Sequence, residues 1–154
     1  MNTAIVGNVL YGFDDEIKAW VAQRIPGFVA TAAATTLGVK HDDYVVAGIV
    51  FERYNGVHVE ASIAVDHMGW ANKETMRRIF SYPFNQLDCK AVSVTVPSSN
   101  IKSLNLATKM GFEPEAYVKF AAHDGSSLVV LKMFRDNCKW IKENGQEFQG
   151  TVST

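Results

Sequence analysis

The clearest pattern along the chain is an alternation of apolar and mixed positions from Val57 to Val65. The odd positions are all apolar. The even positions are His58, Glu60, Ser62 and Ala64. Side chains of a strand point alternately to its two faces, so this segment predicts a strand with one apolar face and one mixed face. The apolar face belongs against a core, and chemistry can take place on the mixed face.

A helix is predicted after this strand, beginning near Lys73. Met76, Ile79 and Phe80 follow the i, i+3, i+4 spacing of a buried helical stripe. Pro83 ends this helix, because proline disfavours helical backbone at the residue before it and has no amide hydrogen. The segment between the strand and the helix, which runs through Gly69, is therefore a loop that leads into a helix N-terminus.

A second strand and a second helix follow. Ala91 to Val96 is short and rich in β-branched residues, which is typical of a buried strand. Ser98, Ser99 and Asn100 are favourable N-cap residues in a row, and Gly111 is a favourable terminator for the helix that follows them. The apolar positions of this helix are Ile101, Leu104, Ala107 and Met110. The order strand, helix, strand, helix implies two parallel strands joined by a right-handed crossover.

The N-terminal part predicts one strand and one helix. The apolar run from Ala4 to Leu10 is read as a first strand. Asp14 is the expected N-cap of a helix that Pro26 and Gly27 end. The small residues from Phe28 to Thr35 have no period and are read as a loop.

Two more strands are predicted before the alternating segment. Thr36 to Lys40 is read as a short strand, and Tyr44 to Tyr54 as a central strand, because it is apolar on both faces. Asn55 and Gly56 form the preferred sequence of a two-residue type I′ hairpin turn, in which both central residues need positive φ.

The C-terminal part predicts another hairpin. Ala116 to Ala122 and Ser127 to Met133 are read as strands on either side of a turn at Gly125. Arg135 to Lys142 is expected to form a short helix or an extended edge that docks Trp140 and Ile141. An edge strand near Ser127 would allow pairing between protomers, which leaves a homodimer open.

Length and composition indicate one soluble domain. A chain of 154 residues can bury roughly 68–70% of its unfolded surface, enough for one core. We expect a single domain over residues 1–143 and a flexible tail over residues 144–154, which is polar and rich in Gly, Ser and Thr. No segment reaches the roughly 20 apolar residues of a membrane span, and no secretion signal is evident, so a cytoplasmic location is expected.

Charge and cysteine content exclude further classes of protein. The net charge of −1 disfavours a dedicated nucleic-acid binder, which is normally strongly basic. Cys89 and Cys138 have no paired spacing, and the four histidines show no metal-ligand pattern, so neither a disulfide framework nor a metal site is predicted.

The loop before the first of the two central helices is a candidate anion site. Amide hydrogens at a helix N-terminus have no partner within the helix, and the helix dipole favours negative charge there. The residues of this loop and helix start are Met68, Gly69, Trp70, Ala71, Asn72 and Lys73. Arg78 lies further along the helix and is a candidate to face a bound phosphate. The alternative is a capped helix without a ligand, with its cations on a solvated face.

Two stretches resemble the GNAT N-acetyltransferases, which use acetyl-CoA. The sequence Asn100-Ile101-Lys102-Ser103, followed by Lys109-Met110-Gly111-Phe112-Glu113-Pro114-Glu115, is similar to the closing motif of that family. Ile79 to Leu87 and Cys138-Lys139-Trp140 resemble a short bacteriophage branch of it, for which the location would be the host cytoplasm. The similarity extends from about Ala4 to Ile141. It implies a mixed α/β (α+β) fold, with a mostly antiparallel sheet of six to seven strands, flanking helices and one parallel pair of strands that part.

The resemblance assigns roles to individual residues. The backbone of Ile63, Ala64 and Val65 would contact the thioester, and Asn100 and Ser103 would contact the arm of acetyl-CoA. Glu60 is the first candidate for the base that deprotonates the amine, and His58 is the second. Without the resemblance, each is more simply a surface residue of a strand, and Asn100 and Ser103 are ordinary first-turn residues.

The general acid of the family is usually a tyrosine, and Ala107 stands at the matching position. Either another group such as Tyr117 serves as the acid, transfer proceeds more slowly without one, or no transfer takes place. Two functions are therefore open. The first is an acetyl-CoA-dependent N-acetyltransferase that transfers an acetyl group directly to a primary amine of a protein or small molecule. The second is a non-catalytic module of the same fold that binds acyl-CoA or a host protein.

Overall fold

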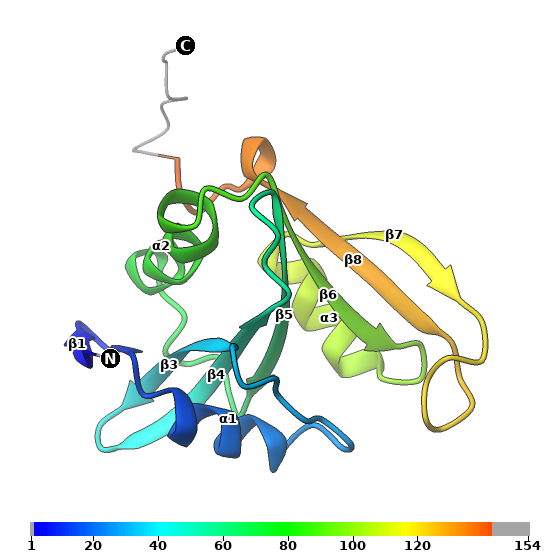
Figure 1. Cartoon of the computed structure of the whole chain (residues 1–154), viewed down its shortest axis with the longest axis horizontal. Coiled ribbons are helices and arrows are strands. Elements are labelled where there is room, and N and C mark those ends of the chain that lie inside the picture. The colour runs from blue at the N-terminus through cyan, green and yellow to red at the C-terminus, as the bar shows by residue number, and fades with distance from the viewer. Residues whose placement is uncertain (1, 143–154) are drawn as a thin grey trace.

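The computed structural model describes residues 2–142, which form one eight-stranded sheet flanked by helices (Figure 1). The strands are β1 Ala4–Val6, β2 Val9–Tyr11, β3 Thr35–His41, β4 Tyr44–Glu52, β5 His58–Val65, β6 Ala91–Pro97, β7 Glu113–Val118 and β8 Leu128–Phe134. Their order in the sheet is β1-β2-β3-β4-β5-β6-β8-β7. Only β5 and β6 are paired in parallel, and the other neighbouring strands are antiparallel. The predicted tail over residues 144–154 lies outside the described residues.

The helices lie on both faces of the sheet. They are α1 Asp14–Ala22, α2 Lys73–Ser81 and α3 Ile101–Met110, with a π-helical turn at Tyr82–Gln86 and a 3-10 turn at Arg135–Asn137. Along β4, Ile49 and Phe51 belong to one buried cluster and Val50 to another, because successive side chains point to opposite faces. Ile17 of α1 packs in the cluster of Val50. The helix α1 therefore covers one face, and α2 and α3 cover the other.

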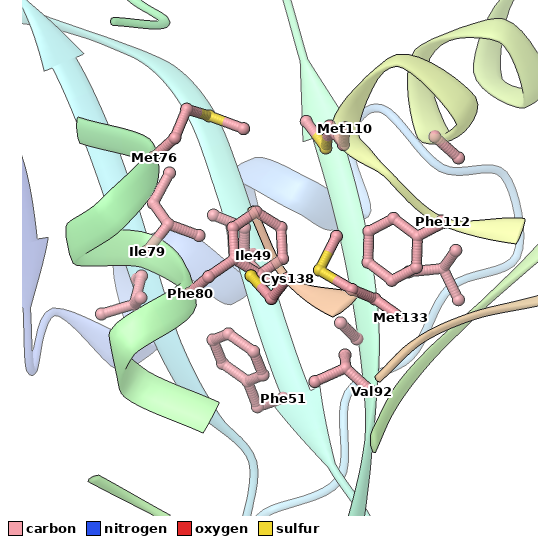
Figure 2. Packing of buried hydrophobic residues seen from close by; sticks show 14 of the residues in the cluster. Ile49, Phe51, Met76, Ile79, Phe80, Val92, Met110, Phe112, Met133 and Cys138 are labelled. Atoms are coloured by element: carbon pink, nitrogen blue, oxygen red, sulfur yellow. The ribbon is translucent and has the colours of Figure 1, made fainter. Parts of the chain in front are cut away.

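The larger core lies beneath α2 and α3. Figure 2 shows Met76, Ile79 and Phe80 of α2 approaching Ile49 and Phe51 of the sheet, with Phe112 and Met133 in the same cluster. The rings of Phe80 and Phe112 are 6.0 Å apart between centroids. This ring contact joins α2 to the segment that follows α3, so both helices are held on the same face.

The central predictions are confirmed. The alternating segment forms β5, and α2 begins at Lys73 with Met76, Ile79 and Phe80 buried. Next, β6 and α3 appear where expected, and Gly111 ends α3 with a φ of 114°. Only the predicted stripe of α3 is partly wrong: Ile101 is 61% exposed, because the first turn of α3 extends beyond the core.

The N-terminal prediction needs two corrections. The run from Ala4 to Leu10 is a hairpin of two strands, because Gly7 takes a φ of 62° and reverses the chain. The sheet consequently has eight strands rather than six or seven. Asp14 is the first residue of α1 rather than its N-cap, and its carboxylate accepts hydrogen bonds from the amide and the hydroxyl of Thr36 on β3.

The predicted type I′ turn at Asn55 and Gly56 is also wrong. Gly56 has positive φ, but the other positive-φ residue of this connection is Arg53 rather than Asn55. The side-chain oxygen of Asn55 instead accepts hydrogen bonds from the amides of Val57 and His58. This local side-chain bond replaces the backbone turn and lengthens the connection between β4 and β5.

The prediction that Pro83 ends the helix is confirmed, since α2 stops at Ser81. The chain continues through the π-helical turn, in which the amide of Leu87 donates to the carbonyl of Tyr82. A wider turn accommodates a residue without an amide hydrogen. Because Pro83 and Phe84 are buried, tertiary packing stabilises this turn.

The C-terminal hairpin has a different order in space from its order in the chain. β8 lies between β6 and β7, so β7 is the edge strand. The predicted edge near Ser127, and the pairing between protomers that it suggested, are therefore wrong for this strand. The prediction that Trp140 and Ile141 dock is confirmed, since Trp140 Nε1 donates to the carbonyl of Met110 at 2.7 Å and Ile141 is buried.

Candidate functional site

The two parallel strands part after a short paired segment. β5 pairs with β6 only at His58 with Ala91, Val59 with Val92, and Glu60 with Ser93. Beyond Glu60, β5 stays paired with β4 as far as Val65, and β6 stays paired with β8 as far as Pro97. Each strand is thus held by its outer neighbour, and a split opens between them.

Backbone groups of β5 face this split. The carbonyl of Val57 accepts from Lys90 on the β6 side, whereas the amide of Asp66 donates to Val46 on the β4 side. Peptide groups alternate along a strand, so those of odd residues point toward β6. Ile63 and Val65 therefore present their amides to the split, while the amide of Ala64 points toward β4.

Polar side chains gather on the sheet face beside the split. His58, Glu60 and Ser93 lie on the face that α1 partly covers, opposite to the face of Val59 and Val92. His58 Nε2 and Ser93 Oγ are 2.8 Å apart. Burial lowers the pKa of His58, the positive charge of Lys132 lowers it further, and the carboxylates of Glu60 and Glu115 partly oppose this shift. The imidazole is therefore neutral at pH 7.

Glu60 is exposed and paired with a cation. Its carboxylate lies 3.2 Å from Arg53 Nη1, and the same nitrogen lies 3.8 Å from the carboxylate of Glu52. Glu52 is buried and accepts a hydrogen bond from the amide of Thr31 at 2.7 Å. Arg53 thus connects the predicted base to the loop after α1. Accepting a proton would remove the negative charge that holds Glu60 to Arg53.

The loop after β5 is organised around a buried tryptophan. The ring of Trp70 lies in the core, and its Nε1 donates to the carbonyl of His67. The side-chain oxygen of Asn72 accepts from the amide of Thr75 at 2.9 Å and so caps α2. Within residues 2–142, the amides of Lys73 and Glu74 have no acceptor. Two donors at the positive end of α2 therefore stay available to an anion.

The rest of the loop is exposed and locally bonded. The amide of Gly69 donates to His67 Nδ1, and the amide of Ala71 donates to the carbonyl of Met68. Met68 is exposed. Asp66, at the end of β5, forms a two-bond ion pair with Arg24 after α1, and this pair lowers the pKa of Asp66. The loop is therefore fixed at both ends.

The predicted phosphate cations lie on different sides of α2. Lys73 is exposed beside the free amides. Arg78 is paired with Glu74 at 3.0 Å and lines a pocket of about 320 Å³. The other residues of that pocket are Tyr11, Ser81, Tyr82, Asn85 and Gln86. Lys73 is thus placed with the loop, whereas Arg78 faces the N-terminal strands.

The start of α3 is capped and tied to the hairpin loop. The side-chain oxygen of Asn100 accepts from the amide of Ser103 at 3.1 Å, which is the capping role that the sequence also allowed. The neighbouring Ser99 donates to Asp124 at 2.5 Å. Hydroxyl groups of Ser126 and Ser99 hold the pKa of Asp124 well below its usual range. No sequence signal indicated this link between α3 and the β7–β8 loop.

The two positions considered for a general acid are separate. Ala107 is buried in the core beneath α3. Tyr117 is 66% exposed and pairs with Val129, which pairs with Val96, so Tyr117 lies on the face of α3 and opposite to Glu60 and His58. The structure therefore places Tyr117 across the sheet from both predicted bases.

Sequence reasoning missed Ser93, Arg53 and Lys132 as members of this polar group. Ser93 is a buried polar residue within a strand that is otherwise mostly β-branched, and that contrast was the available signal. Arg53 and Lys132 carried no local signal, because the sheet alone brings them near Glu60 and His58.

Both cysteines are buried, and burial raises the pKa of each thiol. We therefore expect Cys89 and Cys138 to stay unreactive toward a disulfide reagent such as DTNB while the protein is folded, because the thiolate is the reactive form. Both thiols should react after unfolding in guanidinium chloride. A thiol that reacts rapidly in the folded protein, measured by absorbance, would contradict this expectation.

Residues 2–142 contain neither a metal-binding group nor a membrane-spanning helix. No group of three or more His, Cys, Asp or Glu residues in that range could hold a metal ion. No helix there is long and apolar enough to cross a membrane.

Comparison with known proteins gives matches at the level of structure. No protein-family model and no curated protein sequence matches the chain. Mutant forms of the spermidine/spermine N-acetyltransferase SpeG from Vibrio cholerae share 16% identity over 78% of this chain and 75% of theirs, with a TM-score of 0.57. The N-acetyltransferase PseH from Campylobacter jejuni, in complex with acetyl coenzyme A, shares 17% identity over 68% of this chain and 70% of its own, with a TM-score of 0.53.

A third solved structure matches over a larger part of both chains. It is a probable acetyltransferase that shares 13% identity over 88% of this chain and 98% of its own, with a TM-score of 0.64. The chain therefore has the fold of the GNAT N-acetyltransferases.

Proposed function

We propose that this protein is an acetyl-CoA-dependent N-acetyltransferase that transfers the acetyl group directly to a primary amine. The observation that carries the proposal is the split beyond Glu60 and Ser93, where β5 and β6 stop pairing. Unpaired strands expose amide donors, and the amides of Ile63 and Val65 face the opening. Such donors stabilise the oxyanion that forms when an amine attacks a thioester.

The substrate acetyl-CoA would lie along the split with its diphosphate at the start of α2. The free amides of Lys73 and Glu74, the dipole of α2 and the ammonium of Lys73 suit a polyanion. The loop from Met68 to Asn72 lies beside them. The arm would pass Ser103 at the start of α3. Asn100 is engaged as a cap, so its contribution would come from holding that helix end in place.

The reaction itself forms one bond and breaks one. The amine nitrogen attacks the thioester carbon, the carbon–sulfur bond breaks, and the thiolate of CoA departs while the amine loses a proton to a base. A thiol with a pKa of about 8.5 leaves without obligatory protonation near neutral pH. Transfer is therefore compatible with Ala107 in place of a tyrosine, and Tyr117 is the alternative acid.

Two side chains are candidates for the base. Both lie beside the split, on the face of the sheet that α1 partly covers. Glu60 is one residue from the split but is paired with Arg53. His58 is two residues further back and is neutral at pH 7. Glu60 is three residues and His58 five residues from Ile63, about 10 Å and about 17 Å along β5, so a base at either position would act through bridging water. Neither cysteine is accessible, which favours direct transfer over a covalent cysteine intermediate.

The acceptor is proposed only as a class, a primary amine of a small molecule or a protein. Among the structural neighbours, one is a spermidine N-acetyltransferase in complex with CoA and spermine. Polyamines are therefore the first acceptors to test, followed by lysine side chains and aminosugars. The bacteriophage resemblance, the host-cytoplasm location and oligomerisation stay predictions from the sequence.

Binding of acetyl-CoA should raise the melting temperature. At a concentration of about 100 times the dissociation constant, a ligand stabilises the folded state by about 2.7 kcal/mol. For a chain of this size, this corresponds to about 5–11 °C. Differential scanning fluorimetry with acetyl-CoA, and with ADP at the same concentration as a control, measures this shift. The proposal fails if acetyl-CoA gives no greater shift than ADP.

A non-catalytic module is the second candidate, because Ala107 occupies the usual position of the acid. Acetyl-CoA binding should then occur without consumption. Release of free CoA thiol, followed colorimetrically with a panel of amines, separates the two functions. Release that depends on one class of amine supports the enzyme. Saturable binding without release for every amine, including a lysate fraction of small molecules, supports the module.

A further inference from the structure

A buried hydroxyl contacts the imidazole beside the split. Ser93 is 5% exposed, and within residues 2–142 its side chain has a single hydrogen-bond partner, His58 Nε2, at 2.8 Å. Ser93 also forms the last paired position before β5 and β6 part, opposite Glu60. The hydroxyl of Ser93 is therefore fixed by the sheet. The imidazole of His58 is only partly buried, so the hydroxyl can orient it.

From this contact, we propose that Ser93 is a positioning residue that holds the ring of His58 by Nε2, so that Nδ1 takes the proton of the attacking amine through bridging water. The inference deepens the proposed acetyl transfer and rests on it. Nδ1 has no partner among the described residues, so it is the nitrogen left for substrate. To accept a proton, Nδ1 must carry the lone pair, which requires the hydrogen on Nε2 to point to Ser93 Oγ.

Protonation of Nδ1 leaves the bond to Ser93 intact. The Nε2 donor becomes part of a charged ring, and a hydrogen bond from a charged donor is stronger than one from a neutral donor. Ser93 thus supports His58 before and after the amine loses its proton. The proton passes from the amine nitrogen through water to Nδ1, and each water accepts one proton and donates another, so the step balances.

Charged groups from three strands face His58. They are Lys132 on β8, Glu60 on β5 and Glu115 on β7. Lys132 and Glu115 are 2.9 Å apart, and Glu60 is paired with Arg53. Lys132 is the group that opposes a positive charge on the imidazole, and Glu60 favours that charge once it forms. This arrangement keeps the free base neutral and still allows it to be protonated during the reaction.

The first test measures the tautomer of the His58 ring and does not require catalytic turnover. Nitrogen-15 NMR of the intact protein should show the Nε2–H tautomer of His58 at pH 8, and a mixture of both tautomers in Ser93→Ala. Ser93→Thr retains a hydroxyl and should retain the Nε2–H tautomer. If the wild-type ring carries its hydrogen on Nδ1, or if Ser93→Ala leaves the tautomer unchanged, the inference is overturned.

The second test is kinetic. Ser93→Ala should lower kcat by about 10-fold to 100-fold, by analogy with groups that orient metal-binding histidines, and Ser93→Thr should restore most of the loss. Lys132→Met should move the acidic limb of the kcat/KM profile to higher pH, because removal of the positive charge raises the pKa of His58. Unchanged kcat in Ser93→Ala, or an unchanged limb in Lys132→Met, contradicts the inference.

Failure of the proposed function can be distinguished from failure of this inference alone. If wild-type protein binds acetyl-CoA but releases no CoA with any amine, the proposed function fails, and the catalytic role of His58 fails with it. If turnover occurs while the tautomer or the pH limb fails to respond, the proposed function stands and this inference is overturned. Circular dichroism melting of Ser93→Ala, Ser93→Thr and Lys132→Met checks that each variant is folded under the assay conditions.

Discussion

Truncation of Phe112 to alanine should lower the free energy of unfolding by about 3–5 kcal/mol, the usual cost of a large cavity in a core. Phe112 is 1% exposed and packs against Phe80 of α2. The loss is a large part of the roughly 5–15 kcal/mol that stabilises a typical protein. Chemical denaturation gives the change directly, and the melting temperature should fall by about 6–20 °C.

Phe120→Ala is the matched control for this prediction. Phe120 is the same residue type but is 84% exposed, so its truncation should change stability by no more than about 0.5 kcal/mol. Because Phe112 links α2 to the segment after α3, Phe112→Ala should also weaken acetyl-CoA binding. Similar destabilisation by both variants would show that the cluster of Figure 2 is not the core that holds the helices.

Replacement of His58 by glutamine should lower kcat by about 10²–10⁴, the usual contribution of a general base. Glutamine keeps a polar group of similar reach but cannot take a proton. Glu60→Gln should give a smaller loss, because Glu60 acts on the imidazole through its charge and is itself paired with Arg53. Steady-state release of CoA measures both variants under saturating acetyl-CoA.

Two comparisons make this prediction decisive. His123→Gln removes an exposed histidine in the β7–β8 loop, at the opposite end of β6 from His58, and should retain wild-type kcat. Acetyl-CoA affinity should stay nearly unchanged in all three variants, because none contacts the start of α2. If Glu60→Gln costs more than His58→Gln, Glu60 is the base, as the sequence first suggested, and His58 has a supporting role.

The segment from β5 to α3 could be predicted because its signals are local. The alternation around Glu60, the helical spacing of Met76, Ile79 and Phe80, and the terminator Gly111 each act over a few residues. Period and caps follow from backbone geometry, and they hold wherever the element packs. The order strand, helix, strand, helix then restricts the topology to a parallel pair.

Other features depended on contacts that the sequence does not display. Asp14 is a residue type that favours a helix N-cap, but Thr36 of β3 lies close enough to donate two hydrogen bonds to its carboxylate. Pro83 correctly indicated the end of α2, but it did not indicate the π-helical turn that follows, in which Phe84 is buried. Asn55 is compatible with positive φ, but its side-chain oxygen finds the amides of Val57 and His58. For Asp14 and Asn55, a tertiary or side-chain contact outweighed a local preference of about 1 kcal/mol.

The candidate site also combines features that follow from the local sequence with features that depend on tertiary contacts. The sequence by itself determined that β5 carries His58 and Glu60 on one face and that a helix N-terminus follows, because alternation and capping are properties of neighbouring residues. Only the tertiary structure decided that the parallel pair stops at Glu60 and Ser93, and that Ser93, Lys132 and Arg53 surround the two candidate bases. The physical reason is that strand separation and cross-strand contacts depend on the outer partners β4 and β8, which are distant in sequence from the residues they position.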